Sequence, residues 1–339
     1  MSLAVRDVLR SRLEEHIAPY GLTSEQVLDQ VDDVFGEPLL VVATGSVLAG
    51  FGRRTSDIDL YVVVPQEVVS SLPMVSYPHG ARVDTALFGA ATLAERHRQV
   101  AARWPPPEPS PAAFARRYRS LDCLSRFGLG LPLATDGGRW ESWQREVEAD
   151  VADWLASWYA AEAVRKQRAA RQLLPAKPRV AAQKAGEAMV AALERRAVLA
   201  GERYFKWKFV GEKMRRLGDE QGLAWAWEAF CLPPAVADSA RYVERADEVV
   251  GTLLADVDTR GWRLRPMLAP GVTRHEFGGE VLISRWRLRT VAVDPESPAA
   301  TAHGWDYGLA EPWHPDVAAL FAEDMLWLGI AGPATGGDR

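Results

Sequence analysis

A glycine–serine turn followed by two aspartates, standing between two apolar runs, constrains this chain more than any other feature. Residues 39–42 are apolar and partly β-branched, which predicts a buried strand. Gly45 and Ser46 follow, and the successive backbone N–H groups of such a turn favour phosphate oxygens. Asp57 and Asp59 stand at the leading end of a second predicted strand, where residues two apart share a face. We therefore expect both carboxylates to point to the same side, close to the turn.

Two carboxylates on one face beside a phosphate-binding turn predict a magnesium site. Mg²⁺ takes hard oxygen ligands, is usually held by one or two carboxylates, and completes its shell with water and substrate phosphates. The alternative is a pair of solvent-facing acids that keep an edge strand from aggregating. The Gly-Ser turn upstream of the two acids favours the magnesium site.

The pattern G-S-x-x-x-G-x(6)-D-x-D over residues 45–59 resembles the signature of the DNA polymerase β-like nucleotidyltransferase superfamily. The resemblance covers residues 36–90 and is to the catalytic domain of antibiotic or minimal nucleotidyltransferases. It implies a small mixed sheet flanked by helices, two Mg²⁺ ions, and transfer of a nucleoside monophosphate from an NTP, with ATP as the expected donor. Phe51 and Gly52 stand where many relatives carry a small hydroxyl residue, which leaves the subfamily open.

The resemblance also implies a third carboxylate on a later strand, and Asp84 within the strand-like segment 80–88 supplies it. An ordinary surface acid is the alternative for this residue. Metal binding and catalysis are thereby assigned to three acids: Asp57, Asp59 and Asp84. Phosphate binding is assigned to the turn and to a serine before the second strand: Gly45, Ser46 and Ser56.

Two lysines are further candidates for the triphosphate. The apolar spacing predicts a helix over residues 202–217, and Lys206 and Lys213 lie two turns apart along the border of its apolar face. In relatives, lysines from a helix behind the catalytic sheet contact the triphosphate, so the resemblance makes both residues candidates. Ordinary lysines that cover the edge of a core are the alternative.

The order of the predicted elements indicates an α+β fold. We expect a nucleotidyltransferase-fold mixed sheet with flanking helices, followed by a mainly helical second domain with a small β element. The proline-rich run at residues 105–111 cannot lie inside a helix and reads as a linker. The expected domains are a catalytic domain at 1–104, that linker, a helical domain at 112–258 and a small α/β extension at 259–339, closed by a helix over residues 316–328.

The acceptor is less constrained than the donor. The chain carries a net charge of −5, but residues 160–216 hold 15 Lys or Arg against 5 Asp or Glu. Chain length, the helical second domain and the overall acidity favour AMP transfer to a hydroxyl of a small molecule, with release of pyrophosphate. The basic segment favours RNA, tRNA or a protein as acceptor instead. A non-catalytic nucleotide-binding regulatory protein is the third hypothesis.

Composition limits the compartment and the other cofactors. No apolar run is long enough to span a bilayer, so no membrane is expected. Cys123 and Cys231 are far apart without metal-ligand spacing, which predicts reduced core residues of a cytoplasmic protein. The six histidines form no zinc pattern. A homodimer is left open, and so are the base specificity and a separate general base.

Overall fold

Interleaved segments of the chain build two compact units. The computed structural model describes residues 3–35, 37–68, 73–232, 235–301 and 304–333. Unit 1 consists of Met1–Ala102, Arg117–Leu155 and Gly201–Lys206. Unit 2 consists of Arg103–Arg116, Ala156–Ala200 and Trp207–Arg339. Each unit therefore combines segments from more than one of the expected domains.

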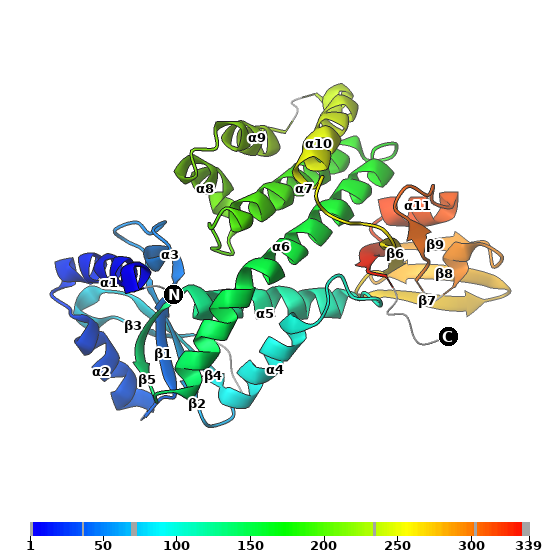
Figure 1. Ribbon diagram of the computed structural model, residues 1–339. Coiled ribbons are helices and arrows are strands. Elements are labelled where there is room, and N and C mark those ends of the chain that lie inside the picture. Colours follow the sequence, from blue (N-terminus) through cyan, green and yellow to red (C-terminus); the bar gives the residue numbers. More distant parts are fainter. Residues whose placement is uncertain (1–2, 36, 69–72, 233–234, 302–303, 334–339) are drawn as a thin grey trace. The chain divides into compact units, whose positions relative to one another are not determined.

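Unit 1 is organised on a mixed five-stranded sheet (Figure 1), whose strand order is β3-β4-β2-β1-β5. The strands are β1 (Leu40–Thr44), β2 (Ile58–Val64), β3 (Met74–Ser76), β4 (Val83–Gly89) and β5 (Leu131–Thr135). β2 runs parallel to β4, whereas β1 pairs antiparallel with both β2 and β5, and β3 pairs antiparallel with β4. Every residue of β1 is buried, because both faces of the sheet are covered.

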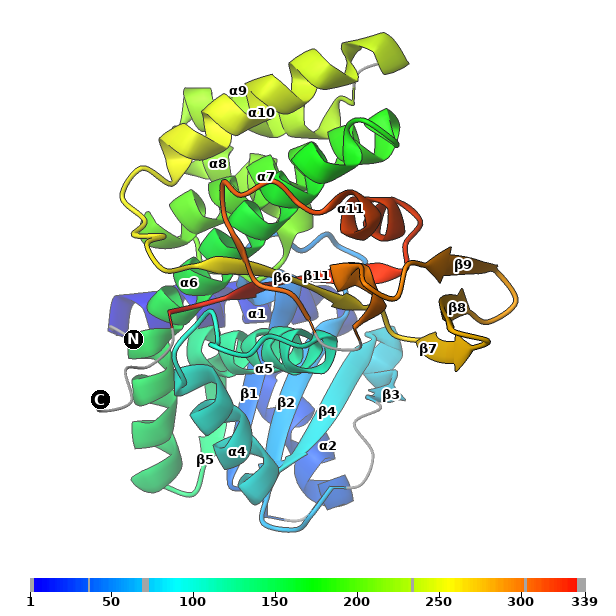
Figure 2. The ribbon, with the colours of Figure 1, turned by 90° about the vertical axis from the view of Figure 1, so that its right-hand side faces the viewer.

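Helices cover the two faces of this sheet. Those of unit 1 are α1 (Leu3–Ile17), α2 (Ser24–Phe35), α3 (Gly45–Leu48), α4 (Ala90–Ala101), α5 (Pro111–Leu129) from Arg117 onward and α6 (Arg139–Leu173) up to Leu155, with short 3₁₀ turns η1 (Ala18–Tyr20) and η2 (Pro78–Gly80). Figure 2 shows α2 behind the sheet and α4 and α5 in front of it. Leu9, Leu13 and Ile17 recur every four residues and join the sheet in one core.

Unit 2 is mainly helical and carries two small antiparallel sheets. Its helices, besides the rest of α6, are α7 (Pro178–Leu199), α8 (Val210–Arg216), α9 (Glu220–Phe230), α10 (Ser239–Leu253) and α11 (Pro315–Ala322), with η3 (Trp207–Phe209), η4 (Val236–Asp238) and η5 (Pro298–Ala300). One sheet has the order β10-β6-β11, from β6 (Arg263–Leu268), β10 (Tyr307–Gly308) and β11 (Leu326–Ala331). The other has the order β7-β8-β9, from β7 (Val272–Phe277), β8 (Glu280–Arg285) and β9 (Arg289–Val293). The predicted α+β class is confirmed.

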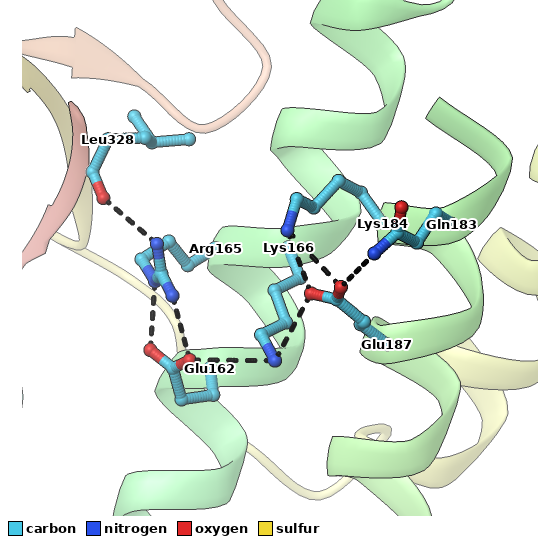
Figure 3. A network of polar contacts seen from close by, with 7 residues as sticks. All are labelled: Glu162, Arg165, Lys166, Gln183, Lys184, Glu187 and Leu328. Atoms are coloured by element: carbon cyan, nitrogen blue, oxygen red, sulfur yellow. Dashed lines mark hydrogen bonds and ion pairs between the residues drawn. The ribbon is translucent and has the colours of Figure 1, made fainter. Parts of the chain in front are cut away.

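A polar network links elements of unit 2 (Figure 3). Glu162 on α6 accepts two hydrogen bonds of 2.8 Å from Arg165, whose third contact is the carbonyl of Leu328 on β11 at 3.3 Å. Lys166 on α6 lies 3.5 Å from Glu187 on α7. Buried charges are tolerated when they are paired in this way.

Among the described residues, no helix is both long and apolar enough to span a bilayer.

Two predicted elements and the predicted burial of one cysteine differ from the structure. The prediction of one helix over residues 202–217 is wrong. Residues 202–206 are not helical, and only the short elements η3 and α8 follow them. The closing helix expected over 316–328 ends at Ala322, and β11 pairs with β6 instead. Cys231 is exposed, so only Cys123 is the buried residue expected of both cysteines.

Candidate functional site

The carboxylates of the predicted site gather at one end of β2 and β4. Asp59 on β2 lies opposite Asp84 on β4 in the parallel register, and opposite Thr44 on β1 in the antiparallel one. Asp57 directly precedes β2. Ile58 and Leu60 belong to the core that α1 and α2 share with the sheet. Alternation along the strand therefore turns Asp59 to the opposite face, which α5 covers.

An aromatic cluster closes that face next to the carboxylates. The ring of Tyr61 on β2 lies 4.9 Å from that of Phe88 on β4 and 5.3 Å from that of Phe127 on α5, measured between centroids. Tyr61 is two residues beyond Asp59 and so shares its face. These ring contacts hold α5 against the strands and place aromatic side chains next to the carboxylates.

The glycine of the turn lies directly against Asp59. Gly45 has φ +90°, a backbone region that favours glycine, and a β-carbon at this position would overlap the Asp59 carboxylate. Ser46 follows in α3, where its carbonyl accepts a hydrogen bond from the N–H of Phe51 at 2.8 Å. The expected proximity of the Gly-Ser turn and the second aspartate is present in the structure.

Burial raises the pKa of Asp59 above its ordinary value, although Arg126 opposes this change. The neighbouring charges of Asp57 and Asp84 raise the pKa of Asp59 further. The three acids therefore lie close enough to act on one another electrostatically. A local concentration of negative charge of this kind favours a bound cation.

Two arginines, which were not predicted as site residues, bring positive charge to these acids. Arg126 on α5 brings its Nη1 within 3.2 Å of Asp59 Oδ1, and its Nε lies 3.7 Å from Asp122 Oδ1. Arg82 holds Asp84 in a bidentate pair with two hydrogen bonds of 2.8 Å. The Arg82 contact follows from strand alternation, since the two residues are two apart. Nothing local in the sequence signals the Arg126 contact.

The structure separates the two candidate lysines. Lys206 belongs to unit 1, where its Nζ lies 2.7 Å from Asp122 Oδ1. Lys213 belongs to unit 2, has a fully buried side chain, and lies 2.5 Å from Glu194 Oε2 between α7 and α8. Because the predicted helix is absent, the two lysines do not share a helix face.

Ser56, the third residue predicted to bind phosphate, closes a local turn: its hydroxyl oxygen accepts a hydrogen bond from the N–H of Arg53 at 2.9 Å.

The donor chemistry fits magnesium through two of the three acids. Across the described residues, no three His, Cys, Asp or Glu side chains are grouped so that they could hold one metal ion. Mg²⁺ needs only one or two carboxylates when substrate phosphates complete its shell. Asp57 and Asp59, which flank Ile58 at the start of β2, form such a pair. Asp84 is held by Arg82 in this structure.

Comparison with known proteins leaves the family open. No protein-family profile matches the chain, and no curated protein sequence matches it. One solved structure to which the chain is similar is a nucleotidyltransferase-like protein from Exiguobacterium sibiricum. The two chains are 13% identical, the match covers 69% of this chain and 79% of the other, and the TM-score is 0.38. A likeness of this size identifies neither a family nor an activity.

Proposed function

We propose that this chain is a Mg²⁺-dependent nucleotidyltransferase that transfers AMP from ATP to a hydroxyl of a small-molecule acceptor and releases pyrophosphate. The observation that supports it is the position of Gly45, whose backbone lies directly against Asp59. A phosphate-binding turn and a cluster of carboxylates in contact are what a nucleoside triphosphate with its cation requires. Asp57 and Asp84 extend the cluster.

The proposed roles follow from these positions. The backbone N–H groups of Gly45 and Ser46 would bind phosphate oxygens of the nucleotide. Asp57 and Asp59 would hold the nucleotide's Mg²⁺. The second ion that the resemblance implies would require Asp84 to leave its pair with Arg82 and join them. The bound metal would neutralise phosphate charge and lower the pKa of the acceptor hydroxyl. Arg126 lies beside Asp59 and would stabilise negative charge on the departing pyrophosphate.

The reaction is an in-line displacement at the α-phosphorus. The acceptor's hydroxyl oxygen forms a bond to this phosphorus while the bond to the bridging oxygen of the β-phosphate breaks. Pyrophosphate leaves with that electron pair, and the hydroxyl proton passes to a carboxylate of the cluster.

Ion pairs made by the basic segment support a small acceptor over RNA, tRNA or a protein. Most of the lysines and arginines of residues 160–216 are already paired with acids: Arg165, Lys166, Arg171, Lys177, Lys184, Arg195, Arg196, Lys206, Lys213, Arg215 and Arg216. A surface that binds a polyanion needs cations that remain available to phosphates. The excess positive charge of this segment is therefore smaller in effect than its composition indicates.

A non-catalytic nucleotide-binding protein is the second candidate function. Two observations favour it, namely the pairing of Asp59 with Arg126 and the bidentate pairing of Asp84 with Arg82. In each case a guanidinium already neutralises a carboxylate that would bind the cation. Under this second function, the chain would bind a nucleotide through the turn and report its presence to a partner without transferring a nucleotidyl group.

Labelled nucleotides separate these functions. Purified protein would be incubated with Mg²⁺ and each α-³²P-labelled NTP, with small-molecule, tRNA and protein acceptors in turn. Asp57→Asn removes one proposed ligand, and Asp7→Asn, at an exposed position of α1, is the matched control. Label in an acceptor with wild type and Asp7→Asn, but not with Asp57→Asn, is the expected result. Nucleotide binding without label transfer to any acceptor would favour the second function instead.

A further inference from the structure

The small sheet of β7, β8 and β9 in unit 2 has an open edge (Figure 2). β9 lies at that edge, next to β8. Within the described part of the chain, no backbone group of residues 290–293 makes a hydrogen bond outside the ladder with β8. Every second residue of an edge strand directs its N–H and C=O groups away from the sheet. β9 therefore presents donors and acceptors to which another strand can pair.

The side chains of β9 do not protect this edge. Natural proteins usually guard an edge strand with charged residues, prolines or bulges. Residues 290–293 are Thr, Val, Ala and Val, with neither a charge nor a proline among them. The opposite edge of the same sheet is β7, which carries arginine, histidine and glutamate at 274–276. The two edges thus differ, and only the β9 edge is suited to pairing.

The turn that leads from β8 into β9 exposes large apolar side chains. Trp286 is 80% exposed and Leu288 is 74% exposed. The guanidinium of Arg287, between them, lies 5.9 Å from the centroid of the Trp286 ring. Tryptophan and arginine are the residues that most often dominate the binding energy of protein interfaces. The turn therefore favours a protein surface as the neighbour of this edge.

The charges around β9 are ordered along the strand. Arginines stand before its apolar residues, at 285, 287 and 289, and acids stand after them, at 294 and 296. Asp294 and Glu296 are exposed, and neither is ion-paired with any described residue. Arg287 also lacks an ion-pair partner among the described residues.

The other two arginines are already held within unit 2. Arg285 donates a hydrogen bond of 3.0 Å to the Asp324 carbonyl, and Arg289 is paired with Glu323. The charges that remain available to a neighbouring molecule are therefore one cation at the start of the strand and two anions at its end.

A second copy of the same strand, running antiparallel, complements this order of charges. About a two-fold axis near the middle of β9, the start of each strand lies beside the end of the other. Arg287 of one copy is then close to Asp294 and Glu296 of the other. The apolar turn residues of one copy lie against residues 294–296 of the other, which include the exposed Pro295.

The same arrangement stops at two copies. When two β9 strands pair, both outer edges of the joined sheet are β7 strands. The charged segment 274–276 protects those edges from further pairing. β9 itself is only five residues long and ends at Val293, before Pro295. A closed dimer is thus favoured over an open filament.

We infer that β9 pairs antiparallel with β9 of a second copy of this chain and forms a two-fold symmetric dimer. Stable interfaces bury about 1,200 Å² or more in total, and a five-residue strand with one tryptophan and one leucine per copy lies at the low end of this range. The dimer should therefore dissociate on dilution. The inference is independent of the proposed function, because residues 285–296 all belong to unit 2 and none is assigned to the nucleotide site.

Sedimentation velocity over a range of micromolar concentrations tests the inference. The mass of the wild type should rise from the 37.4 kDa of one chain toward twice this value as the concentration increases. Ala292→Lys places two like charges near the two-fold axis, at an exposed position that tolerates lysine in the monomer, and should abolish this rise. Ala240→Lys, at an exposed position of α10, is the matched control and should dimerise like the wild type.

Charge reversal tests the antiparallel arrangement itself. Arg287→Glu and Glu296→Arg each set like charges against one another at both ends of the interface, so each should weaken association about tenfold. An equimolar mixture of the two variants should associate like the wild type, because opposite charges then meet at both ends. Only contact between two copies produces this recovery, since the two residues stand at opposite ends of β9 within one chain.

A wild type that stays monomeric at every concentration would overturn the inference. A dimer that Ala292→Lys and both charge reversals leave unchanged would overturn it as well, because such a dimer would use another surface. Weakened association that the mixture does not restore would reject the antiparallel pairing. A thermal melt of each variant checks that the protein is folded.

Discussion

The backbone of Gly45 lies so close to Asp59 that a β-carbon on the glycine would overlap Oδ2 of the aspartate. The contact arises because β1 and β2 are antiparallel neighbours, with Thr44 in register with Asp59. The chain leaves β1 at Thr44 and enters the turn with φ +90° at the next residue. Absence of a side chain here thus serves both the backbone conformation and the approach of the carboxylate.

Replacement of Gly45 by alanine is expected to abolish ATP binding and to destabilise the protein. The positive φ alone costs about 1 kcal/mol or more, and displacement of Asp59 adds to it. Gly21→Ala is the matched control, because Gly21 has φ +67° and nothing within 4 Å of an added β-carbon. Urea denaturation would measure the stability, and calorimetry would measure the affinity for ATP. Retention of wild-type ATP affinity by Gly45→Ala would contradict the proposed phosphate-binding turn.

Removal of Arg126 is expected to strengthen metal binding and to weaken nucleotide binding. In the metal-free protein its guanidinium neutralises Asp59. Arg126→Met should therefore tighten Mn²⁺ binding by about 1 kcal/mol, roughly fivefold in Kd. Metal-free ATP should bind more weakly, because Arg126 also lines the small pocket beside Gly45.

Electron paramagnetic resonance of Mn²⁺ would measure the first effect and calorimetry the second. Arg145→Met, which removes an exposed arginine paired with Glu141, is the control and should change neither affinity. Weaker Mn²⁺ binding by Arg126→Met would show that Asp59 is not a ligand whose charge competes with this arginine.

The part of the site that the sequence predicts is local. Strand alternation places Asp57, Asp59 and their turn from residues close in the chain, and β2 begins and ends where the apolar run predicts. The α+β class follows from the same patterns. These signals are strong because each depends on short-range periodicity and turn chemistry, which tertiary contacts here reinforce.

The part that the sequence does not predict depends on distant segments. Arg126 reaches Asp59 only because β5, which follows α5, pairs with β1. Residues 131–135 give no strand signal, since Pro132 interrupts a very short run. β11 has an apolar run that periodicity cannot distinguish from a buried helix.

The lysine prediction failed for a tertiary reason. Residues 202–206 have helical spacing, yet the Tyr204 ring stacks on Phe51 and the Lys206 ammonium pairs with Asp122. These contacts require a non-helical backbone and outweigh a weak helix propensity. Helix therefore begins only after this segment, and Lys213 takes its place inside unit 2.

Lys213→Met is expected to destabilise the protein without affecting the nucleotide site. The side chains of Lys213 and Glu194 are both fully buried and lie 2.5 Å apart. Breaking such a pair from one side costs roughly 3–5 kcal/mol, because the remaining charge stays buried. The double variant Lys213→Met/Glu194→Leu should recover most of this loss in urea denaturation. Its ATP affinity should equal that of the wild type. A selective loss of ATP binding would instead support the prediction that Lys213 contacts the nucleotide.

Glu162 gives unit 2 a pH-dependent contribution to stability (Figure 3). Burial opposes ionisation of this carboxyl, but the charge and two hydrogen bonds of Arg165, aided by Lys166, outweigh burial and lower its pKa below the ordinary 4.5. The unfolded chain therefore binds the proton more readily than the folded one. The contribution is complete above pH 4.5 and is lost as the pH falls through the lower pKa of the folded state.

Glu162→Gln should therefore lower the free energy of unfolding by about 2–4 kcal/mol at pH 7, because Arg165 keeps its buried charge without a carboxylate partner. The difference from wild type should stay constant down to about pH 5 and shrink below the ordinary glutamate pKa. Urea denaturation at a series of pH values measures this difference. Glu220→Gln, at an exposed position of α9, is the control that should match wild type throughout. A difference that is unchanged at low pH would mean that Glu162 stabilises α6 and β11 through shape and hydrogen bonding, and not through its charge.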